Sequence, residues 1–287
     1  MPPDLNRLGT PTVFWRRLVA PALITVIVIG AHLSFGILEH YDKILSSITA
    51  CFIVELALGR LVTGKWPNPT SAYISGNSIG ILIRSSLNWP YVLCAAVTIA
   101  SKYALRYKGR HLWNPSNFGV SSLFFLAPFA VAPLSIQWGN NLWPILAIWT
   151  IGVIVIWRLK RFHVCLAYVT GFLLFAAVRS VLTGQLYVTE IAPLTGPMYQ
   201  LFILFMITDP KTTVQSKTGR MSVAFLIAFV EMLFRMGEII YAPFYALFLV
   251  GPVAMILEAR REEKLRALES PSEVDRTGQR AVPALDR

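Results

Sequence analysis

Two polar stretches interrupt an otherwise apolar chain and carry the side chains best suited to hold a ligand. The first covers residues 108–119, where Arg110 and His111 supply donors and either Asn114 or Ser116 can cap the helix that follows. A helix start with positive charge beside it suits an anionic or flavin-like ligand. The alternative is a capped loop whose basic residues only set the orientation in a membrane.

The second polar stretch, residues 208–213, closes an apolar segment that is too short to cross a bilayer. Pro197 to Thr208 is 12 residues, about 18 Å as a helix, whereas the hydrocarbon core is about 30 Å thick. Because Pro197 opens this segment and Asp209-Pro210 closes it, we predict a broken helix that ends inside the protein. Irregular backbone at that depth survives only where it is buried or lines a cavity.

Asp209 lies at the end of this broken helix, where its carboxylate needs hydrogen-bond donors. It either braces its own loop or belongs to a ligand site. The donors that we expect are backbone amides, Lys211, or the loop 114–117. The last of these requires the two polar stretches to lie on the same side of the membrane and to meet.

The composition is typical of a membrane protein. Of the 287 residues, 55% are hydrophobic and only 14% are charged. The formal net charge of +11 comes from Lys and Arg clustered between apolar runs, so we expect a lipid bilayer as the partner and not nucleic acid. The three cysteines lie in apolar runs without a CxxC pair, which favours structural thiols over a metal site or a disulfide.

Apolar runs predict ten membrane segments between a polar N-terminal segment, residues 1–17, and a tail, residues 259–287. The segments are expected at 18–36, 44–62, 71–86, 90–105, 117–134, 142–158, 163–182, 197–208, 221–237 and 239–258. The tail begins as a charged helix, and its composition predicts disorder from about Ser270.

The distribution of Lys and Arg predicts the topology. If the N-terminus is cytoplasmic and each segment reverses direction, the inside stretches hold 19 of these residues and the outside stretches hold one, Lys43. This asymmetry follows the positive-inside rule. We therefore expect a multi-pass protein of the plasma (inner) membrane with both termini cytoplasmic.

Ten segments divide into two halves of five, residues 18–134 and 142–258, and an odd number per half gives the halves opposite orientations. The third segment of each half is short and is interrupted or bounded by Gly and Pro. Such segments at matching positions indicate a ligand site between inverted repeats. The predicted fold class is therefore an all-α polytopic membrane protein with ten transmembrane or half-membrane helices in two inverted repeats of five. The alternative is that both short segments are ordinary buried helices of a larger bundle.

Three stretches, taken in order, resemble a known membrane family. Residues 75–82 (SGNSIGIL), Lys102 with residues 109–119 (GRHLWNPSNFG), and residues 205–212 (FMITDPKT) are similar to its broken segment, its Asn-Pro motif and its Thr-Asp-Pro motif. The family contains the D subunit of Rnf complexes and the B subunit of the sodium-pumping NADH:quinone reductase. The resemblance covers roughly residues 70–225. It implies ten helices in two inverted repeats, a fold related to urea and ammonium channels.

The resemblance also implies a flavin site. The candidate cofactor-binding residues are Gly76, Asn77, Lys102, Arg110, His111, Trp113, Asn114, Asn117, Thr208, Asp209 and Thr212. Family members with covalent FMN carry a threonine in a Gly-Ser-x-Gly-Glu-Thr-Ser element, whereas the corresponding residues 135–142 contain no threonine. We therefore expect the flavin, FMN or riboflavin, to be held non-covalently.

The function that the resemblance implies is membrane electron transport, with electrons passing to partner subunits or to a quinone, so that the protein would be an oxidoreductase component. Trp113, Asn114, Thr208 and Asp209 would frame the ligand. The alternative is a solute channel or transporter of the same inverted-repeat fold without a redox cofactor. In that case polar groups at the two broken helices would line a path.

Ionisable side chains inside the expected segments are rare and usually face a polar interior. Glu55 lies in the middle of the second segment. Glu231 and Arg235 are four residues apart in the ninth, a spacing that lets them pair. Arg84 and Arg179 are expected near the outer ends of their segments, where snorkelling to the interface is the alternative to a functional role.

Overall fold

The computed structural model describes the protein at residues 25–26, 29, 41–133 and 142–269. The expected first segment at 18–36 and the predicted disorder beyond Ser270 lie largely outside these residues. So does nearly all of the stretch 135–142.

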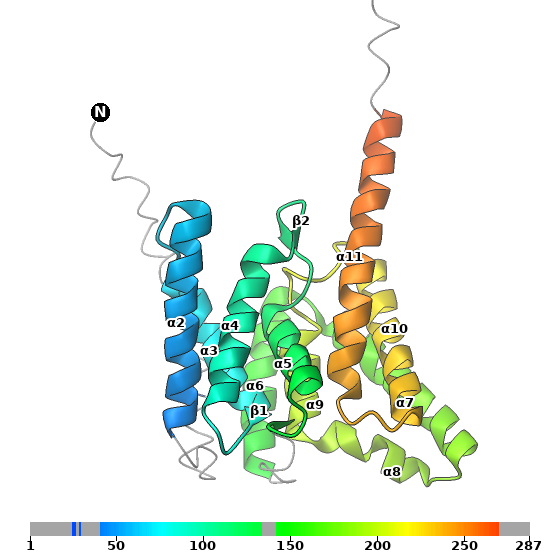
Figure 1. Ribbon diagram of the computed structural model, residues 1–287. Helices are drawn as coiled ribbons and strands as arrows, with labels where there is room; N and C mark the ends of the chain where they lie inside the picture. The colour runs from blue at the N-terminus through cyan, green and yellow to red at the C-terminus, as the bar shows by residue number, and fades with distance from the viewer. Residues whose placement is uncertain (1–24, 27–28, 30–40, 134–141, 270–287) are drawn as a thin grey trace, which may run out of the picture.

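Helices dominate the described chain, and their order follows the expected segments (Figure 1). The first set is α2 (Tyr41–Thr63), α3 (Pro69–Leu82), α4 (Trp89–Ala104) and α5 (Pro115–Leu126). The second set is α6 (Leu142–Leu159), α7 (Phe162–Thr183), α8 (Tyr187–Ile191), the 3-10 turn η3 (Ala192–Thr195), α9 (Pro197–Leu201), the π-helical turn η4 (Phe202–Met206), α10 (Lys217–Met236) and α11 (Ala242–Glu269). Two short antiparallel ribbons join loops: β1 (Ile83–Arg84) pairs with β4 (Ala132–Pro133), and β2 (Arg106–Tyr107) pairs with β3 (Arg110–His111).

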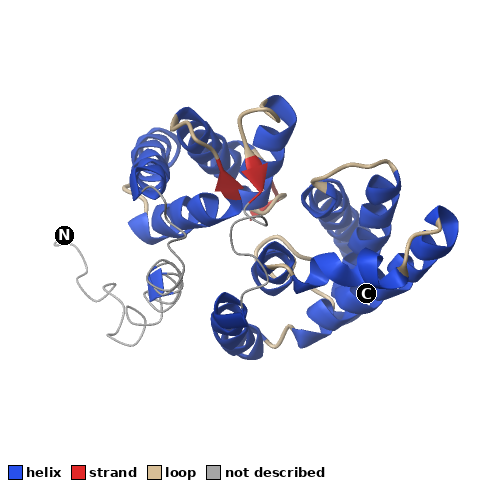
Figure 2. Ribbon diagram, turned by 90° about the horizontal axis from the view of Figure 1, so that it is seen from below, coloured by secondary structure: helices blue, strands red, loops and turns tan. Residues whose placement is uncertain are grey.

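Each set packs around its own long helices, and the two sets share one core. In the first set α2 contacts α3 and α4, and α4 contacts α5; in the second α7 contacts α10, and α10 contacts α11. Figure 2, seen along the helices, shows the two clusters beside each other. Aromatic rings join them: Phe124 of α5 stacks on Tyr241 with 3.9 Å between ring centroids, and it also contacts Phe244 of α11.

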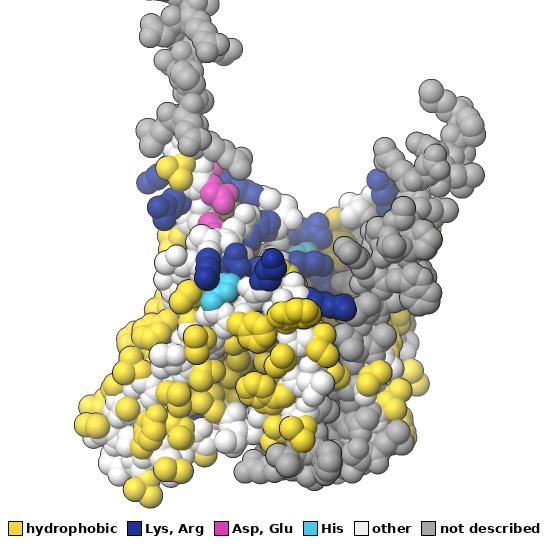
Figure 3. Space-filling view, turned by 180° about the vertical axis from the view of Figure 1, so that it is seen from behind, with side chains coloured by type: hydrophobic (Ala, Val, Ile, Leu, Met, Phe, Trp, Pro, Cys, Tyr) yellow, Lys and Arg dark blue, Asp and Glu magenta, His cyan; other side chains and the backbone are white. Residues whose placement is uncertain are grey.

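Within the described part of the chain, three helices are long and apolar enough to cross a membrane: α2, α7 and the Ala242–Leu265 part of α11. Large apolar side chains on these helices are exposed, among them Ile53 on α2 and Val181 on α7. Figure 3 shows such side chains over the lower part of one face, with Lys and Arg gathered above them. This distribution indicates association with a lipid bilayer. We call the end that carries the loops 105–114, 158–161 and 209–216 the basic end.

The first short segment is α3, and local chemistry fixes both of its ends. The side chain of Asn68 accepts a hydrogen bond from Thr70 N and Pro69 occupies the first turn, a favourable start. The helix ends at Leu82 after 14 residues because Ile83 is extended and enters β1. At about 1.5 Å per residue it spans roughly 21 Å, less than a bilayer core.

The second short segment is the pair α9 and η4, which confirms the prediction of a broken helix. Gly196 is extended before Pro197, and the α-helix gives way after five residues to a π-helical turn that ends at Met206. The hydroxyl of Thr208 donates to Leu204 O at 2.7 Å and so satisfies one carbonyl of the final turn. π-helical turns are rare and are frequent at functional sites.

Three further segments have bounds that differ from the prediction for local reasons. The fifth segment is shorter than 117–134 and begins earlier, at Pro115, because Asn114 caps it; it ends at Leu126, since Ala127 precedes a proline and leaves helical geometry. The ninth begins at Lys217, where the side chain of Ser216 caps it. The tenth continues to Glu269 and absorbs the charged helix expected in the tail. The sequence also gave no indication of α8 and η3.

Candidate ligand-binding site

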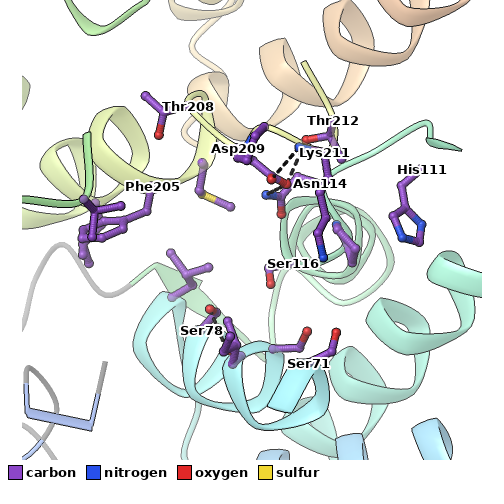
Figure 4. A pocket seen from close by; sticks show the side chains of 18 of the residues that line it. Ser71, Ser78, His111, Asn114, Ser116, Phe205, Thr208, Asp209, Lys211 and Thr212 are labelled. Atoms are coloured by element: carbon purple, nitrogen blue, oxygen red, sulfur yellow. Dashed lines mark hydrogen bonds between the residues drawn. The ribbon is translucent and has the colours of Figure 1, made fainter. Parts of the chain in front are cut away.

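A cavity of about 560 Å³ lies between the two short segments, the helix α3 and the broken helix α9–η4 (Figure 4). Its volume is within the range of roughly 300–1,000 Å³ that small-molecule sites occupy. The apolar lining comes mainly from α3, α9 and η4 and includes Ile74, Ile81, Leu82, Val155, Leu201, Leu204 and Phe205. The polar lining includes Asn68, Ser71, Ser78, Lys102, His111, Asn114, Ser116, Thr208, Asp209, Lys211 and Thr212. The cavity therefore combines an apolar wall with a set of donors and charges near the basic end.

Asp209 joins the two polar loops. Its Oδ2 accepts hydrogen bonds from Asn114 Nδ2 at 3.1 Å and from Thr212 Oγ1 at 3.0 Å, and its Oδ1 accepts from Lys211 N at 3.0 Å. The contact with Asn114 confirms the prediction that the two stretches meet. Because Asn114 Oδ1 also accepts from Asn117 N at 3.1 Å and caps α5, one amide holds both the helix start and the loop after η4.

Lys102 is a buried cation at the cavity wall. Its Nζ donates to Glu55 Oε2 at 2.9 Å and to Ser71 Oγ at 2.8 Å, while Tyr103 OH donates to Glu55 Oε1 at 3.1 Å. The side chains of Lys102 and Glu55 are each 8% exposed. A buried charge is tolerated only when it is paired and hydrogen-bonded, and this pair meets both conditions while tying α2, α3 and α4 together.

Two helix N-termini lie at the same end of the cavity. Thr70 and Ser71 in the first turn of α3, and Pro115 and Ser116 in the first turn of α5, line it. Backbone N–H groups at helix starts carry partial positive charge and attract anions. Asp209 opposes this field, but its carboxylate already holds three donors. The arrangement favours a ligand with one anionic or strongly polar end.

His111 lines the cavity from β3. Its Nδ1 is buried and has no hydrogen-bond partner among the described residues. Burial lowers the pKa of His111 below its usual value, the charges of Arg106, Lys211 and Lys102 lower it further, and Asp209 opposes them. The imidazole is therefore neutral at pH 7 and leaves an unpaired ring nitrogen beside the cavity.

Six of the eleven predicted site residues line the cavity: Lys102, His111, Asn114, Thr208, Asp209 and Thr212. The other five lie outside its lining and have structural roles in its surroundings. Gly76 allows close contact between α3 and α2, since a Cβ there would lie 2.6 Å from Ile48 Cα. Asn77 is buried, and its Nδ2 donates to Tyr73 O at 3.0 Å within α3.

The remaining three attach the first polar stretch to the second helix set. Arg110 Nη2 donates to Thr213 O at 2.8 Å, and its Nη1 pairs with Glu258 Oε2 at 3.2 Å. Trp113 Nε1 donates to Phe248 O at 2.8 Å, and Asn117 Nδ2 donates to Phe244 O at 3.3 Å. These contacts fix the start of α5 against α11 and so hold Asn114 in place.

The cavity-lining serines of α3 are site residues that were not predicted from the sequence. Ser71, Ser75 and Ser78 all line the cavity, and Figure 4 shows Ser71 and Ser78 on the side opposite Asn114 and Asp209. Their spacing of four and three residues places them on one face of a helix. Serines at helical spacing inside an apolar run are the sequence feature that could have identified this polar face of α3.

A second buried polar cluster lies in the other helix set. Glu231 is fully buried, pairs with Arg235 at 3.1 Å as its spacing predicts, and accepts hydrogen bonds from Tyr168 and Tyr199. Snorkelling is the wrong interpretation for Arg179. That side chain is 2% exposed and pairs with Glu190 at 2.7 Å. Glu190 belongs to α8, an element that was not predicted from the sequence.

Comparison with known proteins gives no match: no family model fits the sequence, and no curated protein is similar to it.

Proposed function

We propose that the protein is an integral membrane electron-transport protein that resembles the D subunit of Rnf complexes and binds a flavin non-covalently in the cavity between α3 and α9–η4. The observation that carries this proposal is the division of the cavity into an apolar wall and an end with two helix N-termini, Lys211 and His111. FMN has the same division, with a flat ring system at one end and a phosphate at the other. Riboflavin replaces the phosphate by a hydroxyl.

The residues present fit such a ligand. Ile74, Ile81 and Phe205 would hold the ring system and exclude water from it, while Ser116 and Lys211 would bind the phosphate. When bound, a flavin supplies one- and two-electron transfer. The proposal places the protein in a membrane electron-transport chain as an oxidoreductase component, with partner subunits or a lipid-soluble quinone as its redox partners.

For the fold we propose ten membrane segments in two inverted repeats, residues 18–134 and 142–258, with both termini on the cytoplasmic side of the plasma (inner) membrane. The packing supports this division, because the second helix of each half contacts the fourth and the fourth contacts the fifth. The positions of Lys and Arg support the orientation.

A matching contact in each half also supports the repeats. Both α3 and α9 begin with a proline, and the third residue of each, Ser71 and Tyr199, accepts a hydrogen bond from a basic side chain. The cations are Lys102 and Arg235, each in the last turn of the long helix that follows. Each cation in turn pairs with a buried glutamate. The hydroxyl groups and the cations thus lie at related positions of the two halves, whereas the glutamates lie on helices of different rank, α2 and α10.

A solute channel or transporter of the same fold is the second candidate. The ion pair between Lys102 and Glu55 favours it, because paired charges beside broken helices are typical of substrate and ion pathways. In this alternative the cavity takes a colourless solute.

The test is to purify the full chain in mild detergent and record its visible spectrum after gel filtration. The electron-transport proposal expects the two visible absorption bands of a flavin to comigrate with the protein, and acid extraction to release the flavin intact. A protein without colour that carries solute across the membrane of proteoliposomes would contradict it and support the second candidate.

A matched pair of variants locates the ligand. Ser78→Phe fills the cavity without removing a polar contact to Asp209, so it should abolish the flavin bands. Thr170→Phe makes the same kind of change on an exposed position of α7 and should leave them unchanged. Equal flavin content in the two variants would place the ligand elsewhere.

A further inference from the structure

A groove separate from the cavity lies at the basic end, where the turn between α6 and α7 approaches the start of α10. Its volume is about 560 Å³, and it is lined by Trp157, Arg158, Lys160, Phe162, His163 and Lys217. Every titratable side chain in this lining is basic. Figure 3 shows basic side chains gathered in a band directly above hydrophobic surface.

Arg161 lies in the same turn but is not among the residues that line the groove. The residue is 8% exposed, and its Nη1 is buried with no hydrogen-bond partner among the described residues. Asp209, the acid whose charge reaches it, is already bonded to Asn114, Lys211 and Thr212. Arg161 therefore adds positive charge to the turn without lining the groove.

The backbone of the turn holds these basic residues in a fixed arrangement. Lys160 N donates to Trp157 O and Arg161 N donates to Ile156 O, both at 3.1 Å, which is the pattern that ends a helix with a left-handed residue. That residue is Lys160, with a φ of 53°, at a position where glycine is favoured. Across the groove, Lys217 is the first residue of α10, whose N-terminus adds partial positive charge.

The aromatic residues of the groove identify the source of the anion. Trp157 is 71% exposed and Phe162 is 46% exposed, and both line the groove together with Arg158, Lys160 and Lys217. Exposed aromatic rings next to basic residues are typical of the headgroup region of a bilayer. A soluble anion would gain nothing from two exposed rings, whereas a lipid has glycerol and acyl groups that contact them.

We propose that this groove binds the phosphate headgroup of an anionic phospholipid from the leaflet at the basic end. Lys160 and Lys217 contact the headgroup from opposite sides, and Trp157 and Phe162 contact the glycerol and the first acyl carbons. The site lies outside the cavity between the two short segments and does not depend on its ligand.

The test uses the full chain in phosphatidylcholine nanodiscs with increasing amounts of brominated phosphatidylglycerol, whose bromine quenches nearby tryptophan fluorescence. The Trp157 contribution is the difference between the wild type and Trp157→Phe. It should be quenched at a low fraction of brominated phosphatidylglycerol and not by brominated phosphatidylcholine. Equal quenching by the two lipids would overturn the proposal.

The charge dependence separates this site from general attraction to the surface. Lys160→Gln with Lys217→Gln removes two exposed charges and should raise the lipid fraction for half-quenching roughly 25-fold, about fivefold for each charge. Arg261→Gln with Lys264→Gln removes two exposed charges from α11 and should leave the lipid fraction for half-quenching unchanged. The same change in both double variants would overturn the assignment to this groove. Displacement of the lipid by millimolar inorganic phosphate would show a soluble-anion site instead.

Discussion

Asn114 Nδ2 donates a hydrogen bond of 3.1 Å to Asp209 Oδ2, and the two residues are 95 positions apart in the chain. The same Asn114 caps α5, and the same Asp209 closes the loop after η4 through Lys211 N and Thr212 Oγ1. One side-chain contact therefore joins the start of a helix in one set to the end of a broken helix in the other. Both residues line the cavity, so the contact also fixes its shape.

Removing the Asp209 carboxylate should destabilise both loops. Asp209→Ala leaves three donors without their acceptor and is expected to cost about 1–3 kcal/mol of folding stability and to abolish ligand binding. Asp209→Asn retains one acceptor oxygen and should be milder for folding. Asn114→Ala should resemble Asp209→Ala, and the double variant should be less than additive because both belong to one network. Melting curves in detergent measure these effects.

Asn68 provides a control for that cycle. It caps α3 and lines the same cavity, and its recorded contact is with Thr70 N and not with Asp209. Asn68→Ala should lose about 1 kcal/mol as a cap and should add fully to Asp209→Ala. The losses of folding stability from Asn114→Ala and Asp209→Ala could also prove fully additive, with normal ligand binding. That result would mean that the contact between the loops does not contribute to stability.

Breaking the ion pair between Lys102 and Glu55 should cost more than losing a surface pair. Either Lys102→Gln or Glu55→Gln leaves an uncompensated charge that is 8% exposed, with an expected loss of roughly 3–5 kcal/mol. The double variant removes both charges and should recover part of that loss. Lys108→Gln breaks the exposed pair with Glu263 and should cost less than about 1 kcal/mol. Similar losses for Lys102→Gln and Lys108→Gln in thermal melts would contradict this account.

Sequence alone predicts the helices that lie between turn signals, because their ends are decided locally. Pro197 opens the second short segment and Asp209-Pro210 closes it, as their residue types indicate, whereas the first short segment begins at Pro69 and not at the expected residue 71. The position of Glu55 in a span also marks it as a residue in need of a partner. That partner, Lys102, is 47 positions away and is found only after the packing of α2 on α4 is known.

The unpredicted parts of the site depend on tertiary packing. Trp113 and Asn117 are polar residues in a promising motif, yet both donate to carbonyls of α11 and take no part in the cavity lining. Sequence spacing gives no sign of that helix–helix contact. The π-helical turn is similar, since nothing in the apolar run 202–206 distinguishes it from an α-helix.

Flavin, if it is the ligand, should leave the protein on denaturation. Covalent FMN needs a hydroxyl at the attachment position, and residues 135–142 offer only Ser135, which lies at a different position. We expect no in-gel flavin fluorescence after denaturing electrophoresis, even from preparations whose native spectrum contains flavin. A fluorescent band at the position of this chain would contradict the prediction, and a protein with covalently bound FMN serves as the positive control.

Cysteine labelling tests the proposed orientation. Single cysteines at Lys43, Asn141 or Gly184, in a background without Cys51, Cys94 and Cys165, should react with an impermeant reagent added from outside the cell. Lys43 and Gly184 lie near the ends of α2 and α7 remote from the basic end, whereas Asn141 is outside the described residues. A cysteine at Lys108, in the β2–β3 turn, is the control and should react only from the cytoplasm. Reaction of Gly184→Cys from the cytoplasm would contradict the two-repeat topology.

The last prediction concerns pH and His111. Burial and the nearby charges of Arg106, Lys211 and Lys102 lower its pKa, so the unfolded chain takes up a proton before the folded protein does as the pH falls below about 6.5. The contribution of His111 to stability is therefore fully present above that pH and is lost as the pH falls through the folded-state pKa. An anionic ligand beside the ring would raise this pKa, so its binding should strengthen on acidification.

His111→Gln isolates this effect from the acid sensitivity of buried carboxylates, which both proteins share. The difference between the melting temperatures of wild type and His111→Gln should change between about pH 7.5 and about pH 5, with the wild type losing more stability. If FMN is the ligand, its affinity for the wild type should rise over the same interval, and that of His111→Gln should rise less. Parallel melting curves together with equal changes in affinity would mean that His111 stays in one protonation state and does not face the anionic end of the ligand.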